Sequence, residues 1–170
     1  HSFPTRRSSD HFVLSPRFAI SCTEELLLSC ADWQKEKSLL VHTHASESLE
    51  EIDLIRKLTG LGNIEYFEKL GLLNPQTVIV HGVHMSDKEL RMMVDSKTPL
   101  VHCPAANLKL ASGIAPIEKY RKQGLTVGLG CDGAPCNNTM DPFLELRLAA
   151  LIQKPGFGPT ALPAAQALEL

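Results

Sequence analysis

The sequence predicts an α/β fold built on a single parallel sheet. Five short apolar segments alternate with stretches of helical periodicity along the 170 residues, which is the pattern of repeated βαβ units. Several of these segments are followed directly by histidine, glutamate or aspartate, and polar groups at the carboxyl ends of parallel strands form the active sites of α/β barrels. No glycine-rich fingerprint follows the first segment, so a dinucleotide-binding sheet lacks its usual signature.

The expected elements begin with a short strand at residues 12–14. Ser21 and Glu24 have the spacing of a capping box, which predicts the start of a helix. The apolar run 38–44 predicts a buried strand of the kind found in parallel sheets. Apolar residues at helical spacing then predict a helix from about residue 49 to residue 58.

The second half of the chain keeps this alternation. Ser86 and Glu89 form another capping-box pattern, and Pro116 stands where proline can open a helix. The expected helices cover residues 64–70, 86–95, 116–124 and 142–152, and the expected strands cover residues 77–81, 100–103 and 125–130.

Five strands in this length correspond to part of a closed barrel. A (β/α)8 barrel typically takes about 250 residues, so we expect the C-terminal part, about strands 4 to 8, of a (β/α)8 TIM-type barrel that is truncated at both ends. Residues 1–10 are polar without usable periodicity and are expected to be a non-native segment. The partial barrel domain then occupies residues 11–170.

Composition argues against several classes of function. The chain is 44% hydrophobic and 21% charged, and its net charge of −2 with scattered Lys and Arg gives no basic footprint for nucleic acid. No apolar run approaches the roughly 20 residues that span a bilayer, and no signal-peptide pattern opens the chain, so we expect no membrane partner and a cytoplasmic location. The five irregularly spaced cysteines include no CxxC zinc pattern and are expected to be reduced thiols.

The motif HTHASE at residues 42–47 is the first candidate site. Residues two apart on a strand face the same side, so His42 and His44 can both point into a barrel mouth, and Glu47 follows within one turn. Imidazole is the commonest protein metal ligand, and a glutamate beside an activated water is placed for proton transfer. The alternative is a strand-end histidine and a glutamate at a helix N-terminus, with no chemical role.

Further candidates follow the next three strands. His81 and His84 are three apart across a glycine, so we expect one to face the site and the other to pack under the loop. His102 fits a hydrogen-bonded core histidine at least as well as a site residue. Asp132 follows the apolar run VGLG, where a buried charge is costly unless a metal or a protonated histidine offsets it.

Taken in order, HTHASE, VHGVH, VHCPAANLKLASGIAP and GLGCDGAPCNNTMDPF resemble the amidohydrolase superfamily, in its branch of metal-dependent deaminases and chlorohydrolases acting on purines and triazines. The resemblance covers residues 11–170. It implies that His44 is a metal ligand and that Glu47 protonates the nitrogen of the heterocycle. It also implies that His81 helps to polarise the attacking water, and that Asp132 binds the metal and accepts the proton of that water.

The resemblance further implies a cofactor, one divalent metal ion, for which Zn²⁺ is expected and Fe²⁺ is the alternative. Family members carry a His-x-His pair on their first strand. The HTH at residues 42–44 does not replace that pair, because it lies on the fifth strand, so two further histidine ligands are expected upstream. Hydrolytic deamination is therefore expected of a full-length parent, itself expected to be a homo-oligomer, and the fragment alone is expected to be inactive.

The resemblance points to a small heterocyclic substrate. Residues 15–18, SPRF, look like the guanine deaminase arrangement, so Arg17 is the candidate substrate contact, with a surface salt bridge as the alternative. The longer signature, DGAPCNN followed by RLAALIQKPGFGPTALPA, looks like deaminases of 5'-deoxyadenosine, methylthioadenosine and S-adenosylhomocysteine and receives more weight. The alternatives are a guanine deaminase, an s-triazine or N-ethylammeline chlorohydrolase, and a truncated fragment without function.

Overall fold

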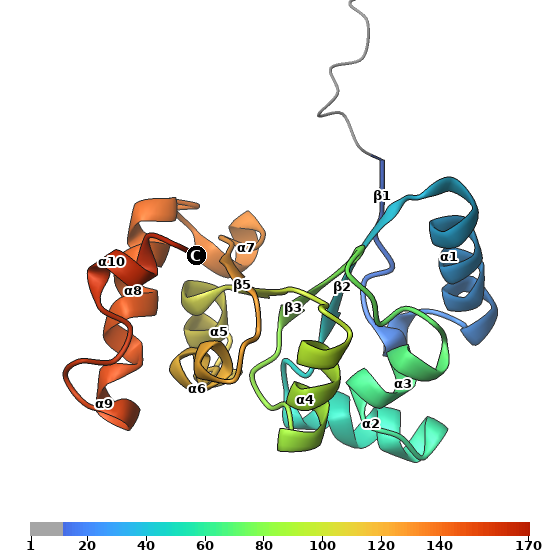
Figure 1. The fold of residues 1–170 in the computed structure, drawn as a ribbon, viewed down its shortest axis with the longest axis horizontal. Coiled ribbons are helices and arrows are strands. Elements are labelled where there is room, and N and C mark those ends of the chain that lie inside the picture. The colour runs from blue at the N-terminus through green and yellow to red at the C-terminus, as the bar shows by residue number, and fades with distance from the viewer. Residues whose placement is uncertain (1–11) are drawn as a thin grey trace, which may run out of the picture.

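A computed structural model of the chain describes residues 12–170 and has the predicted parallel α/β architecture. Figure 1 shows the sheet at the centre of the molecule. The segment expected to be non-native, residues 1–10, lies outside the described residues. In the described part of the chain the sheet has five strands in the order β1-β2-β3-β4-β5. Their bounds are β1 Val13–Leu14, β2 Leu40–Ala45, β3 Thr77–His81, β4 Leu100–His102 and β5 Val127–Leu129.

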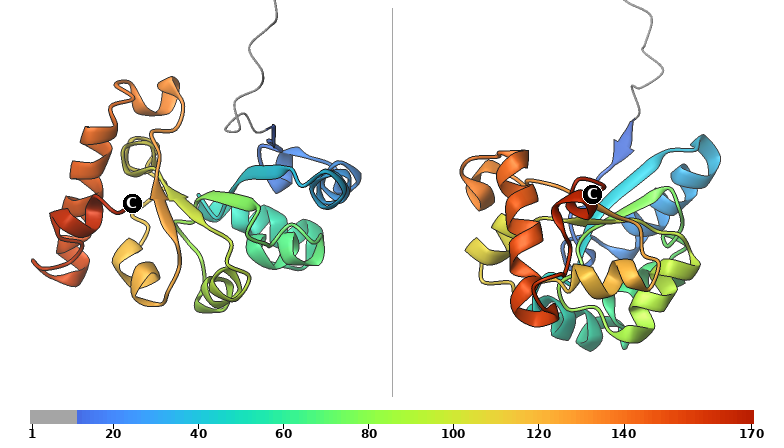
Figure 2. Two further views of the ribbon diagram at one scale, coloured as in Figure 1. Left: turned by 45° about the horizontal axis from the view of Figure 1, so that its top comes forward. Right: turned by 60° about the vertical axis from the view of Figure 1, so that its left-hand side comes forward.

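Every neighbouring pair of strands is parallel, so each strand is followed by a crossover that returns the chain to the same end of the sheet. Figure 2 shows the larger helices in an arc around one side of the sheet. The helical segments are η1 Ala19–Ser21, α1 Glu24–Lys37, α2 Leu49–Thr59, α3 Asn63–Lys69, α4 Asp87–Asp95, α5 Pro104–Lys109, α6 Ile117–Lys122, α7 Ala134–Asn137, α8 Pro142–Ile152, α9 Lys154–Phe157 and α10 Ala164–Ala167.

Two sequence-based expectations for helix starts have different outcomes. Ser86 caps α4 as predicted: its hydroxyl accepts from the Glu89 amide, and the Glu89 carboxylate accepts from the Ser86 amide. The prediction for α1 was wrong, because Thr23 is its cap and accepts from the Leu26 amide. Ser21 instead closes the short η1 turn by bonding to the backbone of Phe18.

The sheet is fully packed on its helix-facing side, whereas alternate side chains of β2 and β4, on the other side, are only partly buried. On the helix-facing side, apolar strand residues such as Val41, Ile79 and Leu100 are fully buried against the helices in the main core cluster. On the other side a small second cluster, made of Val80, Cys103 and Ala106, lies beneath the site described below. The cysteines are all free, as expected. No helix within residues 12–170 is both long and apolar enough to cross a bilayer.

Candidate metal-dependent active site

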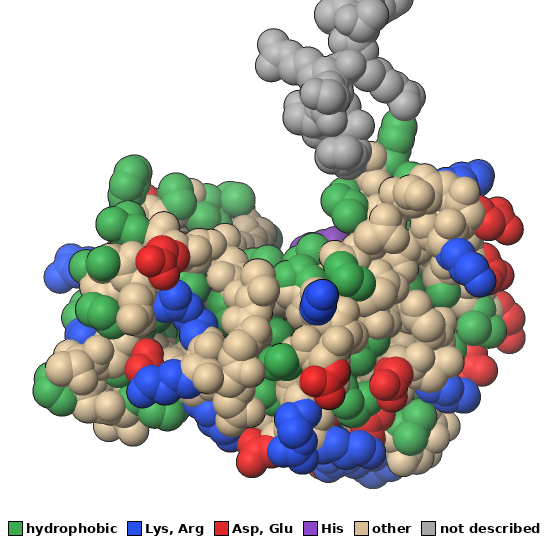
Figure 3. Space-filling model, in the orientation of Figure 1, with side chains coloured by type: hydrophobic (Ala, Val, Ile, Leu, Met, Phe, Trp, Pro, Cys, Tyr) green, Lys and Arg blue, Asp and Glu red, His purple; other side chains and the backbone are tan. Residues whose placement is uncertain are grey.

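The predicted site residues of β2 and β3 come together at the carboxyl ends of these strands. Ala45 pairs with His81 in the sheet register, and the His44 and His81 rings stack with their centroids 5.2 Å apart. The His42 ring contacts His44 edge-on at 5.6 Å, which agrees with the expectation that both histidines face one side. Figure 3 shows histidine atoms in the hollow between the two halves of this face of the molecule.

His44 is oriented by the backbone of the preceding strand segment. Its Nδ1 lies 2.7 Å from the Arg17 carbonyl oxygen, which can only accept, so Nδ1 carries the proton and Nε2 keeps its lone pair. The Phe18 ring stacks on the other face of His44 at 4.8 Å. Burial lowers the pKa of His44, although the Arg17 carbonyl acts in the opposite direction. A neutral histidine whose second nitrogen is fixed by a carbonyl is the usual form of a metal ligand.

Glu47 lies in the turn between β2 and α2, next to His81. Its Oε2 is 3.6 Å from His81 Nε2, and its Oε1 accepts from the Ser112 hydroxyl at 3.2 Å. The His81 side chain is 1% exposed and that of Glu47 is 14% exposed. The Glu47 backbone amide donates to Glu51 at the start of α2, which fixes the turn. A carboxylate and an imidazole are therefore adjacent in a largely water-excluded site.

The backbone at His81 explains how its ring reaches this position. Side chains alternate along a strand, and alternation from the helix-facing Ile79 would direct His81 away from His44. His81 instead has a left-handed backbone with φ of 75°, which turns the chain at the end of β3. Its Nδ1 lies 2.8 Å from Asn107 Oδ1, which holds the ring at that nitrogen.

Asp132 follows β5 and is also in a left-handed conformation, with φ of 61°. Its Oδ1 accepts from the Gly133 amide at 2.6 Å, and the Cys136 thiol donates to its carboxylate. Burial lowers the pKa values of His42 and His44, and the negative charge of Asp132 acts in the opposite direction on both rings. The neighbouring carboxylates and burial together raise the pKa of the Cys136 thiol.

The donor set fits part of a metal shell. His44 offers an oriented, unprotonated Nε2, and Asp132 offers a carboxylate just after β5, which is three strands away in the sheet order. Within residues 12–170, no three His, Cys, Asp or Glu side chains converge to hold a metal ion. The described residues therefore contain donor types that suit a divalent metal but do not form a complete cage.

The remaining predicted positions are also located. The Arg17 side chain is exposed and lies over the Phe18 ring at 5.6 Å, and it makes no ion pair with residues 12–170. His84 packs under the loop after α5, with Nε2 2.7 Å from the Ser112 carbonyl oxygen. His102 is fully buried, but neither ring nitrogen has a partner in the described residues, so the expectation of a hydrogen-bonded core histidine was wrong.

Three polar residues near the site were not singled out from the sequence. Asn107 and Ser112 contact His81 and Glu47, and fully buried Glu145 of α8 accepts from the Ala105 amide at 3.0 Å and from Asn137 at 2.7 Å. No local pattern marks them, because each partner is between 8 and 65 residues away along the chain.

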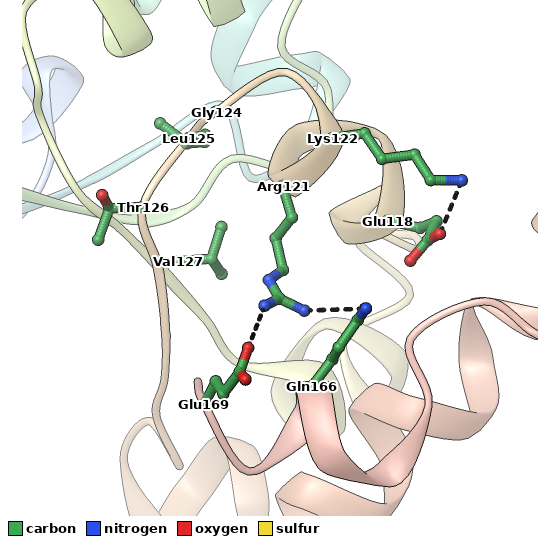
Figure 4. A pocket seen from close by; sticks show the side chains of 9 residues that line it. All are labelled: Glu118, Arg121, Lys122, Gly124, Leu125, Thr126, Val127, Gln166 and Glu169. Atoms are coloured by element: carbon green, nitrogen blue, oxygen red, sulfur yellow. Dashed lines mark hydrogen bonds and ion pairs between the residues drawn. The ribbon is translucent and has the colours of Figure 1, made fainter.

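A separate cavity of about 460 Å³ lies away from these residues. Figure 4 shows it between α6, the residues that lead into β5, and α10, with Arg121 bonded to Gln166 and Glu169. Because residues 124–127 precede or begin β5 whereas Asp132 follows it, this cavity is at the opposite end of the strand from the candidate site.

The fold is that of part of a parallel α/β barrel, and the chain belongs to the amidohydrolase family, whose family model matches residues 8–170. It is 40% identical over 148 residues to a 5-methylthioadenosine/S-adenosylhomocysteine deaminase of Pyrococcus furiosus, covering 85% of this chain and 34% of the relative. It is 37% identical over 153 residues to a 5'-deoxyadenosine deaminase of Methanothermobacter thermautotrophicus, covering 89% of this chain and 36% of the relative. The chain thus spans about a third of the length of these curated relatives.

Solved structures agree with this assignment. A zinc-bound adenosine deaminase of Xanthomonas campestris superposes with a TM-score of 0.88 at 28% identity, over 91% of this chain and 35% of that chain. A guanine deaminase of C. acetobutylicum with bound guanine superposes with a TM-score of 0.83 at 29% identity, over 89% of this chain and 38% of that chain. A zinc-bound atrazine chlorohydrolase of Arthrobacter aurescens superposes with a TM-score of 0.84 at 27% identity, over 91% of this chain and 35% of that chain. The predicted fold, the C-terminal part of an amidohydrolase barrel, is confirmed.

Proposed function

We propose that this chain provides the C-terminal half of the active site of a metal-dependent aminohydrolase that deaminates purine nucleosides of the 5'-deoxyadenosine and methylthioadenosine type. The observation that carries the proposal is the contact between the His44 and His81 rings with Glu47 beside them, at the ends of adjacent parallel strands. The names of the two curated relatives support the substrate class.

His44 and Asp132 would hold a divalent metal ion, for which we propose Zn²⁺ with Fe²⁺ as the alternative. When bound, the metal lowers the pKa of a coordinated water to about 7. His44 serves this role through Nε2, because Nδ1 is committed to the Arg17 carbonyl. Two further histidine ligands would come from upstream strands of a full-length protein that contains this chain.

Glu47, His81 and Asp132 would move the protons of the reaction. Glu47 delivers a proton to the ring nitrogen next to the amine-bearing carbon, which makes that carbon more electrophilic. Asp132, assisted by His81 Nε2, would accept one proton of the attacking water and return it to the amine, which leaves as ammonia. The remaining hydroxyl proton of the tetrahedral adduct would pass back to Glu47 as the carbonyl forms, which restores its acid form. The short separation of Glu47 and His81 supports their joint role.

Arg17 is our proposed substrate contact. Its guanidinium is exposed at the end of β1 and free of ion pairs with residues 12–170, so it can stack on a purine or bond to its edge. The resemblance of residues 15–18 to the guanine deaminase arrangement supports the second candidate, guanine deamination, and a solved guanine deaminase shares the fold.

A substrate panel tests the proposal. The full-length, metal-loaded protein is assayed side by side with 5'-deoxyadenosine, guanine and a chlorotriazine, by release of ammonia or chloride. We expect kcat/KM to be highest for 5'-deoxyadenosine. A preference for guanine would select the second candidate, and release of chloride alone would assign a chlorohydrolase. Metal-loaded protein that is inactive on all three would contradict the proposal.

A further inference from the structure

The segment that includes α5 and the turn after it contacts both proposed proton-moving groups. Asn107 Oδ1 lies 2.8 Å from His81 Nδ1, and Ser112 Oγ donates to Glu47 Oε1 at 3.2 Å. Asn107 is on α5, and Ser112 is in the turn that follows it. The two contacts therefore come from one short stretch of chain, residues 107–112, which reaches Glu47 after β2 and His81 at the end of β3.

This stretch is fixed internally. The amide of Ser112 donates to the carbonyl of Asn107 at 2.9 Å, and the carbonyl of Ser112 lies 2.7 Å from His84 Nε2. The turn is tight, because Ala111 and Gly113 on either side of Ser112 both have positive φ, 57° and 128°. The Ser112 hydroxyl therefore has little freedom to move relative to Asn107.

These contacts close a ring of four residues. It runs from His81 through the Asn107 side chain and backbone to Ser112, then to Glu47, and returns to His81 across the 3.6 Å between Oε2 and Nε2. Asn107 contacts His81 at Nδ1, and Ser112 contacts Glu47 at Oε1. The second polar atoms, His81 Nε2 and Glu47 Oε2, face each other. The geometry between Glu47 and His81 is thus set from outside by α5 and its turn.

We propose that Asn107 and Ser112 are positioning residues for the deamination proposed above, on which this inference rests. Asn107 Oδ1 can only accept, so it fixes the proton of His81 on Nδ1 and leaves the Nε2 lone pair toward Glu47. Ser112 fixes the Glu47 carboxylate so that Oε2, rather than Oε1, faces His81.

Burial argues against a purely stabilising role for Asn107. Its side chain is 1% exposed, yet its Nδ2 has no partner in the described residues. A buried amide donor without an acceptor costs about 1–3 kcal/mol. A side chain selected for stability alone would not leave this donor unsatisfied, whereas one selected for its acceptor oxygen can.

The kinetic test uses Ser112 variants of the full-length, metal-loaded protein. We expect Ser112→Ala to lower kcat roughly 10- to 100-fold, because small misplacements of catalytic groups have effects of this size, with KM changed less than about twofold. Ser112→Thr keeps the hydroxyl and should recover most of kcat. Ser29→Ala on α1, where the hydroxyl donates to the Glu25 carbonyl and to no other residue in 12–170, is the matched control and should keep the parental kcat. Parental kcat in Ser112→Ala, or an equal loss in Ser112→Thr, would overturn the role of Ser112.

A spectroscopic test separates this inference from the proposed reaction. Imidazole ¹⁵N chemical shifts of His81 report which nitrogen carries the proton, whatever the substrate. We expect the Nδ1–H form in the parent and in Asn107→Asp, which keeps an acceptor, and a mixture of tautomers in Asn107→Leu. A parental Nε2–H form overturns the role of Asn107, even if Asn107→Leu fails to fold. Should the parent lack deaminase activity but show the Nδ1–H form, the proposed reaction fails and the positioning geometry stands.

Discussion

His81 and Asp132 have left-handed backbones although neither is glycine, with φ of 75° and 61°. Such conformations cost of order 1 kcal/mol or more and persist where surrounding contacts enforce them. At His81 those contacts are the Asn107 bond and the stack on His44, and at Asp132 they include the Gly133 amide. In both cases the unusual φ occurs where a strand ends and a functional side chain is directed into the site.

His102 should make stability depend on pH. Burial lowers its pKa to about 3, from the ordinary value of 6.5. Between these two pH values the unfolded chain binds a proton at His102 that the folded chain does not bind. The contribution of neutral His102 to the free energy of unfolding is therefore fully present above pH 6.5 and is lost as the pH falls toward 3. When the pH is lowered from 7 to 5, the free energy of unfolding of full-length His102→Leu should therefore rise by about 1–2 kcal/mol relative to that of the parent.

Denaturant unfolding at the two pH values measures this difference. His102→Asn also lacks a titrating ring, so it should show the same pH-dependent gain despite its different packing. His42 and His44 have lowered pKa values as well, but they are present in all three proteins and cancel in the comparison. Free energies of unfolding that differ between parent and variants by the same amount at both pH values would contradict the account of His102.

Strand-end residues were predictable because strand positions and a period of two fix where a side chain lies. That reasoning placed His42 and His44 on one side and expected one of His81 and His84 under a loop, and the structure shows that it is His84. It could not find Asn107 or Ser112, because these residues are 26 and 65 positions along the chain from their partners, His81 and Glu47. Such contacts depend on the tertiary fold and leave no local pattern. Nor could it show that His102 is buried without a hydrogen-bond partner.

At the scale of elements, the strands were predicted to within about three residues, and the long helices α2 and α8 closely. No helix was predicted between the strand at residues 100–103 and residue 116, so α5 was missed. The structure has Pro104 as the first residue of α5, where its missing amide costs nothing. Short helices have no periodicity to detect, and α5 is nevertheless the element that contacts the site.

Helix α8 should stabilise the loop that carries Asp132. Glu145 accepts from the Ala105 amide and from Asn137, whose side chain also donates to the Cys131 carbonyl. Removing this buried carboxylate leaves the Ala105 amide without its acceptor and leaves the Asn137 amide with only its bond to the Cys131 carbonyl. Glu145→Ala should therefore lower the free energy of unfolding by about 2–4 kcal/mol, as measured by denaturant unfolding of the full-length protein.

The matched control is Arg147→Ala, which changes an exposed residue two positions further along the same helix. Its effect should stay within about 0.5 kcal/mol. Equal effects of the two substitutions would show that Glu145 does not hold the loop.

At the scale of the whole molecule, the sheet is open in the described residues: β1 pairs only with β2, and β5 only with β4. The number of strands and their parallel order could be predicted from the alternation of apolar strand segments with helical stretches. The partial barrel could be predicted because the chain is much shorter than a complete (β/α)8 barrel. The substrate could not, because residues 15–18 and the signature that begins at Asp132 resemble deaminases of different substrates.

The open edges predict the behaviour of the 170-residue chain expressed alone. Unpaired strand edges and large exposed apolar side chains such as Phe12 and Phe143 favour association with other chains. Size-exclusion chromatography should therefore show oligomers or aggregates. A monomer with a sharp, reversible thermal transition would contradict this expectation.

The central claim is that Glu47 transfers a proton in a metal-dependent deamination, and one substitution tests it most directly. The measurement is kcat for 5'-deoxyadenosine of the full-length protein with Glu47→Gln, which keeps the shape of the side chain and removes its proton. Our account predicts a loss of roughly 10²- to 10⁴-fold, with bound metal and thermal stability close to those of the parent. Near-parental turnover by Glu47→Gln would contradict it.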